Sequence, residues 1–237
     1  MQRYFAEIIN NKVMLGDDDV HHLLHVMRAR TKDEIEVVDN GKLYSAIITS
    51  INPLTIEVNY QIPSDSELPN KMTLFFALAK GDKIDFVVQK ATELGATRIV
   101  LIKTERCVVK FDEKDISKKL ERFHKIAKEA SEQSHRLTIP EVVGVYDLKK
   151  IPTALLEDVN LLAYEKKAGS TASFYDEIKT NQSTSIMIGP EGGFSEEEVQ
   201  YLEKEYGFKS VSLGKRILRT ETAAVYALSV IGFLLER

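Results

Sequence analysis

The stretch SIMIGPEGGFSEEEV (residues 185–199) decides the fold class of this 237-residue chain. It opens with an apolar run of strand length and continues with three glycines in five residues. Ser195 and Glu198 then form the pattern of a capping box, in which two side chains satisfy backbone N–H groups at a helix start. The stretch therefore predicts a buried strand, a glycine-rich loop, and a helix that begins after Ser195 and ends at Gly207.

Strands and helices alternate on both sides of this stretch. Further apolar runs of strand length are MTLFFALA (72–79), RIVLI (98–102), VNLLAY (159–164) and SVSL (210–213). Apolar residues at helical spacing predict helices over residues 82–94, 113–134 and 221–235. This alternation indicates an α/β domain built on a mostly parallel sheet.

Residues 1–70 have a different pattern of apolar and polar residues, one that is typical of short strands. Asn40-Gly41 lies between two apolar segments and is a strong hairpin signal. One short helix is expected at residues 17–28, because three aspartates favour its N-terminus. A polar segment bounded by prolines (62–69) then reads as a linker. We therefore expect a small β-barrel domain over residues 1–70 and an α/β domain over residues 71–237.

Composition narrows the function classes. The chain is 43% hydrophobic. Its net charge of −4 argues against a non-specific nucleic-acid binder, because such proteins usually carry a basic domain. A single cysteine, Cys107, and five histidines without ligand spacing argue against disulfides and against a metal site. No apolar run is long enough for a membrane span and no secretory signal is evident, so the expected compartment is the cytoplasm.

Three loops that follow predicted strands are candidates for a ligand site, because ligands bind beyond the carboxyl ends of strands in open α/β sheets. They are residues 164–167, 189–194 and 214–223. The glycines of the second loop allow backbone to approach a ligand closely, although a simple strand-to-helix turn would explain them equally well. The third loop carries Lys215, Arg216 and Arg219, which could face an anion or lie in a solvated turn.

The second and third loops resemble a known signature pair. IGPEGGFSEEEV (188–199) and LGKRILRTETAAVYAL (213–228) are similar to the paired motifs of the RsmE-type 16S rRNA uridine-N3 methyltransferases. The resemblance extends to KGDKIDFVVQKATELGATRIVLIKTERCVV (80–109) and ERFHKIAKEASEQSHRLTIPEV (121–142). With Arg3-Tyr4-Phe5 and the 21–28 segment, it covers nearly the whole chain.

This resemblance implies an N-terminal PUA-like β-barrel and an α/β SPOUT domain with a C-terminal trefoil knot. It also implies a homodimer, the cofactor S-adenosyl-L-methionine, and 16S rRNA, within the small ribosomal subunit, as the substrate. Arg219 would lie nearest the reacting centre and stabilise the uracil anion, and Arg3 is a second catalytic candidate. The residues implied to bind the cofactor are Glu165, Gly189, Gly192, Leu213, Gly214, Ile217 and Leu218.

RNA binding must rest on local charge. Residues 1–70 hold six Lys/Arg against eleven Asp/Glu, whereas residues 98–136 hold eleven against seven. The candidate RNA contacts are Arg28, Arg30, Arg122 and Arg136, although cations on a helix face are often merely solvated.

Three further functions are compatible with parts of the sequence. The glycine-rich loop could bind a nucleotide phosphate, but it lacks the Walker and Rossmann patterns. The chain could also be a non-catalytic RNA-binding protein, or a SPOUT methyltransferase that acts on tRNA. The sequence does not identify a general base; Glu221 is possible, but a carboxylate at a helix start is first a capping residue.

Overall fold

The computed structural model describes residues 1–109, 111–164 and 174–237, and its contacts divide the chain into two units. Unit 1 comprises Met1–Glu67 and Ser131–Thr138, and unit 2 comprises Leu68–Ala130 and Ile139–Arg237. The expected division at residue 70 lies close to the first crossing point. The assignment of residues 131–138 to unit 1 was not expected from the sequence.

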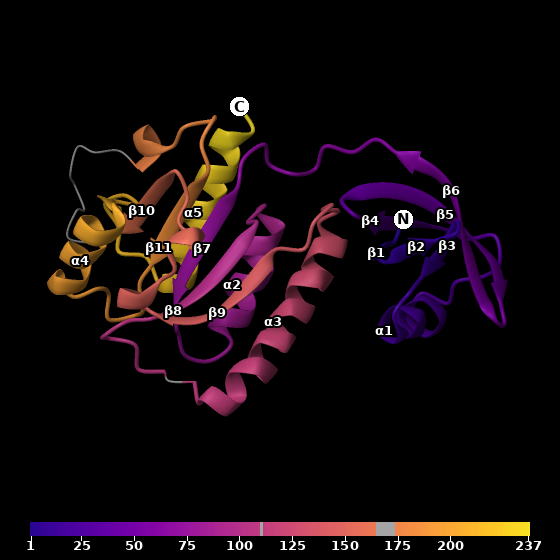
Figure 1. Cartoon of the computed structure of the whole chain (residues 1–237), viewed down its shortest axis with the longest axis horizontal. Coiled ribbons are helices and arrows are strands. Elements are labelled where there is room, and N and C mark those ends of the chain that lie inside the picture. The colour runs from indigo at the N-terminus through magenta and orange to yellow at the C-terminus, as the bar shows by residue number, and fades with distance from the viewer. Residues whose placement is uncertain (110, 165–173) are drawn as a thin grey trace. The chain divides into compact units, whose positions relative to one another are not determined.

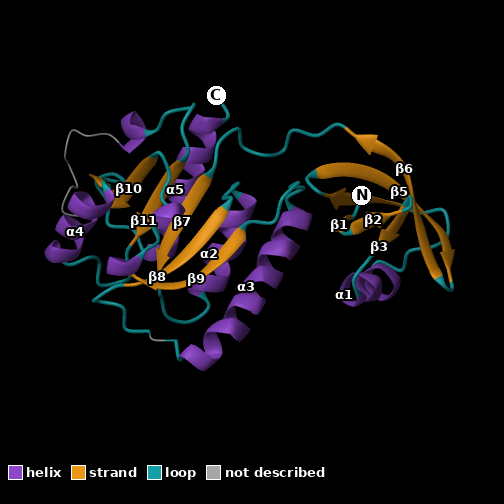
Figure 2. Ribbon diagram, viewed as in Figure 1, coloured by secondary structure: helices purple, strands orange, loops and turns teal. Residues whose placement is uncertain are grey.

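Unit 1 is built on a six-stranded sheet whose neighbours are antiparallel except for one parallel pair, β1 with β4 (Figure 2). The strand order is β1-β4-β5-β6-β3-β2. Asp39 pairs with Lys42 across Asn40 and Gly41, both at positive φ, which confirms the hairpin predicted from Asn-Gly. The strands are β1 (Arg3–Phe5), β2 (Glu7–Ile9), β3 (Lys12–Met14), β4 (Glu34–Asp39), β5 (Lys42–Ile51) and β6 (Leu54–Ile62).

The helix of unit 1 is shorter than expected and changes type along its length. It runs as α1 (Asp17–His21) and continues as a wider π-helical turn over His22–Val26, so it ends before residue 28. His22 Nδ1 lies 3.0 Å from the hydroxyl of the fully buried Tyr4, which ties this turn to β1.

The segment Ser131–Thr138 is bound into unit 1 by polar contacts rather than by strand pairing. Glu67 accepts hydrogen bonds from the backbone N–H of Leu137 at 2.7 Å and of Thr138 at 3.1 Å. Its carboxylate also lies 2.7 Å from Nη2 of Arg136. Ser66 donates a hydrogen bond to the carbonyl of His135 at 2.8 Å. These contacts hold residues 66–67 beside the segment.

Unit 2 is an α/β domain, as predicted, and its six-stranded sheet is parallel throughout, whereas the sequence predicted a mostly parallel one (Figure 1). The strand order is β12-β10-β11-β7-β8-β9, so the direction of winding reverses beside β7. In sheets of this kind a ligand crevice forms where the winding reverses. The strands are β7 (Met72–Ala77), β8 (Arg98–Lys103), β9 (Glu141–Asp147), β10 (Val159–Ala163), β11 (Thr184–Ile188) and β12 (Lys209–Val211).

Alternation along the strands sorts the helices of unit 2 onto two faces. Leu74 and Phe76 of β7 share a core with apolar residues of α2, α3 and α5, whereas Phe75 shares the opposite core with Val199 and Leu202 of α4. The helices are α2 (Lys83–Glu93), α3 (Glu113–Gln133), α4 (Glu196–Tyr206) and α5 (Thr220–Leu235), with short 3-10 helices at Leu148–Lys150, Thr153–Leu155 and Phe174–Glu177.

The predicted ends of α4 are confirmed. Ser195 and Glu198 form a complete capping box, and Gly207 ends the helix in the left-handed conformation at φ 68°. Among the helices of the described residues, none is long and apolar enough to cross a bilayer. The trefoil knot stays a prediction.

Candidate cofactor site

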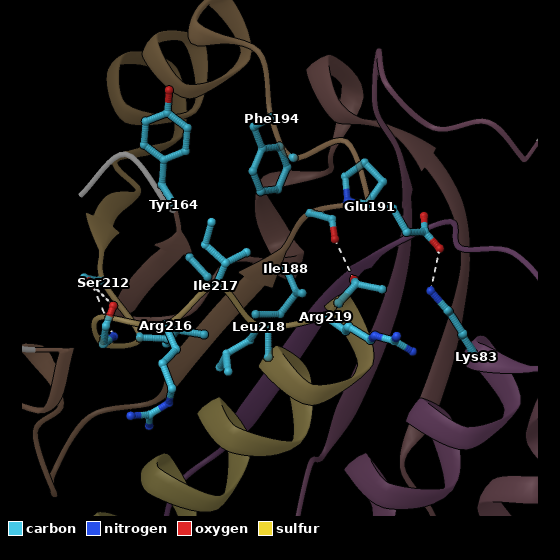
Figure 3. A pocket seen from close by; sticks show the side chains of 18 residues that line it. Lys83, Tyr164, Ile188, Glu191, Phe194, Ser212, Arg216, Ile217, Leu218 and Arg219 are labelled. Carbon is cyan, nitrogen blue, oxygen red and sulfur yellow. Dashed lines mark hydrogen bonds and ion pairs between the residues drawn. The ribbon is translucent and has the colours of Figure 1, made fainter. Parts of the chain in front are cut away.

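A cavity of about 410 Å³ lies beyond the carboxyl ends of β10, β11 and β12 (Figure 3). Its volume is within the range of about 300 to 1,000 Å³ that is typical of small-molecule sites. Two of the three loops predicted from the sequence supply most of its lining. The lining residues are Lys83, Ala163, Tyr164, Ile188, Gly189, Pro190, Glu191, Gly193, Phe194, Ser212, Leu213, Gly214, Arg216, Ile217, Leu218, Arg219, Thr220 and Ala223.

The glycine-rich loop between β11 and α4 is packed tightly against its own phenylalanine. A Cβ at Gly189 would lie 2.9 Å from the ring of Phe194, which is 3% exposed. Gly193 turns the chain at φ 66°, and its N–H donates a hydrogen bond to the carbonyl of Pro190 at 2.9 Å. Only glycine at position 189 therefore lets the backbone lie this close to the Phe194 ring.

The loop between β12 and α5 forms the facing wall of the cavity. Gly214 has φ 118°, and Ser212 Oγ accepts a hydrogen bond from its N–H at 3.2 Å. Ile217 is 87% exposed, which is unusual for a large apolar side chain and leaves it available to cover a ligand. Thr220 joins the two loops, because its hydroxyl donates a 2.6 Å hydrogen bond to the carbonyl of Gly189.

Arg219 is the cation at the start of α5. Its backbone is extended (φ −64°, ψ 154°) and takes the N-cap position, without a side-chain cap. The side chain is exposed, and no hydrogen bond or ion pair joins it to another of the described residues. Figure 3 shows it directed toward the side of the cavity that Lys83 and Glu191 line. Among the described residues, nothing therefore occupies its guanidinium, which is available to an anionic group at the cavity.

Lys83 links two carboxylates at the same side of the cavity. Its Nζ lies 2.8 Å from Glu191 Oε1 and 3.4 Å from Glu221 Oε2. The hydrogen bond to Glu191, together with both negative charges, raises the pKa of Lys83. Partial burial would raise the pKa of Glu191, but the hydrogen bond and charge of Lys83, with the backbone N–H of Lys80, outweigh it and lower that pKa. Both groups therefore stay ionised at neutral pH.

Arg106 contacts the glycine-rich loop but does not line the cavity. Its Nη1 donates a 3.0 Å hydrogen bond to the carbonyl of Gly192, and a Cβ at Gly192 would lie 3.2 Å from Arg106 Cβ. Lys83 and Arg106 were both missed as site residues in the sequence. They follow β7 and β8, so the rule that found the three loops marks the segments after these strands as candidates, but it does not say which of them meet the glycine-rich loop.

The structure brings together most of the predicted cofactor residues. Gly192 is the exception, because it does not line the cavity and its carbonyl is bound to Arg106. Glu165 lies outside the described residues. The predicted cofactor residues that line the cavity are Gly189, Leu213, Gly214, Ile217 and Leu218.

Arg3 is engaged inside unit 1. Its guanidinium lies 2.8 Å from Glu36 Oε2 and donates hydrogen bonds to the carbonyls of His135 and Arg136. These contacts fasten β1 to the segment Ser131–Thr138, and they leave the side chain 4% exposed. A catalytic role for Arg3 stays a prediction, and it would require the guanidinium to leave these partners.

The four predicted RNA contacts have different surroundings. Arg28 and Arg30 are exposed, and Arg28 adopts a positive φ of 54° just after the π-helical turn. Arg122 is also exposed but pairs with Asp85. Arg136 is 3% exposed and bound to Glu67, so an RNA contact stays a prediction that would require its guanidinium to leave this partner.

Comparison with known proteins identifies the family. The family description "RNA methyltransferase domain" matches residues 66–232, and "RNA methyltransferase PUA domain" matches residues 15–59. Ribosomal RNA small subunit methyltransferase E of Bacillus subtilis is 37% identical over 100% of this chain and 98% of its own length.

The chain belongs to the ribosomal RNA small subunit methyltransferase E family.

Other relatives agree. The Synechocystis member is 33% identical and covers 97% of this chain and 76% of its own length. The solved structure of the Neisseria gonorrhoeae member, bound to S-adenosyl methionine, is 33% identical with a TM-score of 0.85 and covers 99% of this chain and 98% of its own. The predicted fold, a SPOUT domain with a PUA-like domain, is therefore confirmed.

Proposed function

We propose that this protein transfers a methyl group from S-adenosylmethionine to N3 of a specific uridine in 16S rRNA. The observation that carries the proposal is the cavity in which the two loops of the family signature meet, with the guanidinium of Arg219 at its lining. Family membership supports the substrate class. A small-subunit rRNA substrate would also place the reaction in the cytoplasm.

The cavity fits S-adenosylmethionine chemically. Leu213, Ile217 and Leu218 give it apolar side chains for an adenine ring, and the backbone at Gly214 can approach a ligand without a Cβ in the way. When bound, the cofactor supplies an activated methyl group on a sulfonium. The residues of the chain then have to position the uracil and manage its charge.

Arg219 is suited to that second task. Uracil N3 carries a proton, so a negative charge develops on the base as N3 becomes a nucleophile. A guanidinium that reaches the base from the cavity lining would stabilise that charge in the way an oxyanion hole does. The proposal assigns no proton transfer to Glu221, because its carboxylate lies against Lys83 and does not line the cavity.

The test is mass spectrometry of nucleosides from 16S rRNA, in cells with and without the gene. We expect deletion to abolish 3-methyluridine and the wild-type gene to restore it. Arg219→Ala should lower kcat by about 10²- to 10³-fold, the effect of losing one oxyanion-hole donor, without changing cofactor affinity. Lys204→Ala is the control, since Lys204 is an exposed cation of unit 2 outside the cavity.

An unchanged rRNA profile together with a lost methylated nucleoside in tRNA would move the substrate to tRNA. Failure of the pure protein to bind S-adenosylmethionine would refute the methyltransferase function and favour a non-catalytic RNA-binding protein.

Arg28 and Arg30 are the proposed RNA contacts of unit 1, because both are exposed cations beside the π-helical turn. Each phosphate contact contributes to the salt dependence of binding. Replacing both with alanine should weaken rRNA binding and lower the slope of log affinity against log salt. The substitution pair Lys12→Ala and Lys42→Ala, on the strands of the same unit, is the control. An unchanged slope would exclude the two arginines.

A homodimer that forms through α5 is also part of the proposal. The helix buries Leu228 in the core, whereas its other face carries apolar side chains that are exposed among the described residues, with Tyr226 42% and Phe233 61% exposed. Exposed apolar patches of this kind mark interaction surfaces. Phe233→Glu should give a monomer by analytical ultracentrifugation. Phe86→Glu, at an exposed phenylalanine of α2, should leave the dimer intact, and a wild-type monomer would refute the proposal.

A further inference from the structure

Three segments that are distant in the sequence meet at the ammonium group of Lys83. Lys83 is the first residue of α2, Glu191 lies in the glycine-rich loop, and Glu221 lies in the first turn of α5. One side chain therefore connects the helix after β7 to both cofactor loops. Figure 3 shows Lys83 reaching across to Glu191 at the edge of the cavity.

The two carboxylates that Lys83 binds belong to the glycine-rich loop and to the helix start that follows Arg219. Glu191 directly precedes Gly192 in the glycine-rich loop. Glu221 is the second residue after Arg219, on the same helical start. A shift of either carboxylate would therefore move a wall of the cofactor cavity or the base of the Arg219 side chain.

We propose that Lys83 is a positioning residue, which fixes the glycine-rich loop and the start of α5 relative to each other and so places Arg219 for methyl transfer. This inference rests on the proposed function. It assigns to Lys83 no contact with the substrate and no proton transfer. Its raised pKa agrees with this role, because an ammonium group that stays charged cannot accept the N3 proton.

A stabilising role alone would not account for the arrangement. Ion pairs between partly exposed side chains contribute little to the free energy of folding. The same helix offers a direct comparison, because Lys90 is 33% exposed and lies 2.8 Å from Glu93, while Lys83 is 30% exposed and lies 2.8 Å from Glu191. Lys90→Met is therefore a matched control for the loss of one lysine and one ion pair from α2.

The kinetic test compares Lys83→Met, Lys83→Arg and Lys90→Met. Misplacing a reacting group by about 1 Å lowers a rate on the order of 100-fold, so we expect Lys83→Met to lower kcat by about 10- to 100-fold. The KM for rRNA and the melting temperature should change no more than in Lys90→Met. Lys83→Arg should restore much of kcat, because a guanidinium can still bridge two carboxylates. A kcat for Lys83→Met equal to that of Lys90→Met would overturn the proposal.

Hydrogen–deuterium exchange gives a readout that does not depend on activity. In the full-length protein without ligand, Lys83→Met should speed amide exchange both in residues 189–194 and in the first turn of α5, and Lys83→Arg should not. Unchanged exchange in either segment would refute the link. The exchange result stands even if the wild-type protein fails to methylate 16S rRNA, an outcome that would refute the proposed function but not the link that Lys83 makes between the two segments.

Discussion

Replacing Gly189 with alanine tests whether the glycine-rich loop is packed tightly against Phe194 and the buried core that contains it. The new Cβ would lie 2.9, 3.1 and 3.3 Å from three atoms of the Phe194 ring. Carbon atoms pack best at about 3.5 to 4.0 Å, so the ring would have to retreat by roughly 0.6 Å or more. Phe194 shares a buried core with Phe75 and Val199, so its retreat would push into packed side chains.

Overpacking of this kind costs about 1 to 3 kcal/mol, so we expect the free energy of unfolding of unit 2 to fall by that amount. Because Gly189 and Phe194 both line the cavity, the affinity for S-adenosylmethionine should also fall, by roughly tenfold for each 1.4 kcal/mol of strain that persists in the complex. Urea denaturation measures the first quantity, and isothermal titration calorimetry measures the second.

Gly144→Ala is the matched control. Its Cβ would meet only Leu120 Cδ1, at an ordinary contact distance of 3.9 Å, so both quantities should stay near those of the wild type. Adding Phe194→Leu to Gly189→Ala should recover part of the loss, because the two residues are in contact and their effects are not additive. If Gly189→Ala kept wild-type stability and cofactor affinity, the packing argument would be wrong.

Three further predictions concern other contacts. Thr220→Val should destabilise unit 2 by about 1 to 3 kcal/mol in thermal unfolding, because the carbonyl of Gly189 loses its donor, whereas Thr220→Ser should retain most of the stability. Ser195→Ala should cost about 1 kcal/mol by removing the capping box of α4, as measured by urea denaturation. Burial alone would raise the pKa of Glu67, but its bonds to Arg136 and Leu137 lower the pKa below 4.5. The stabilisation by Glu67 is thus present above pH 4.5 and lost as pH falls through the lowered value. Glu67→Gln should lower the free energy of unfolding of unit 1 at neutral pH and make it depend less on pH in acid. An unchanged pH dependence would contradict the lowered pKa of Glu67.

Local signals in the sequence predicted the elements that carry the site. The capping box at Ser195 and the Asn40-Gly41 hairpin depend only on neighbouring residues, and both are confirmed. The strand runs before the cofactor loops are apolar because the sheet is covered on both faces. Their carboxyl ends share one edge of the sheet, which is why loops distant in sequence could be expected to meet.

Other features depend on contacts that no local pattern records. The sequence predicted a catalytic role for Arg3 and an RNA contact for Arg136, yet both side chains are buried against carboxylates of unit 1. Lys83 and Arg106 belong to the site because the order of the strands places β7 beside β11 and β8 next to β7. Sequence spacing alone does not contain that order.

The assignment of Ser131–Thr138 to unit 1 has a consequence for synthesis on the ribosome. Unit 1 begins at the N-terminus but lacks the partners of Glu67 until residues 136–138 have been made, about 70 residues later. At typical translation rates of roughly 5 to 20 residues per second, that interval is on the order of 4 to 14 s. During it the carboxylate of Glu67 is without Arg136, and Val38 and Leu43 are without Leu137. Unit 1 therefore cannot be completed until residues 68–130 of unit 2 have been made, and a nascent chain halted before residue 131 should be cut by protease within residues 1–67 more readily than one halted well after residue 138.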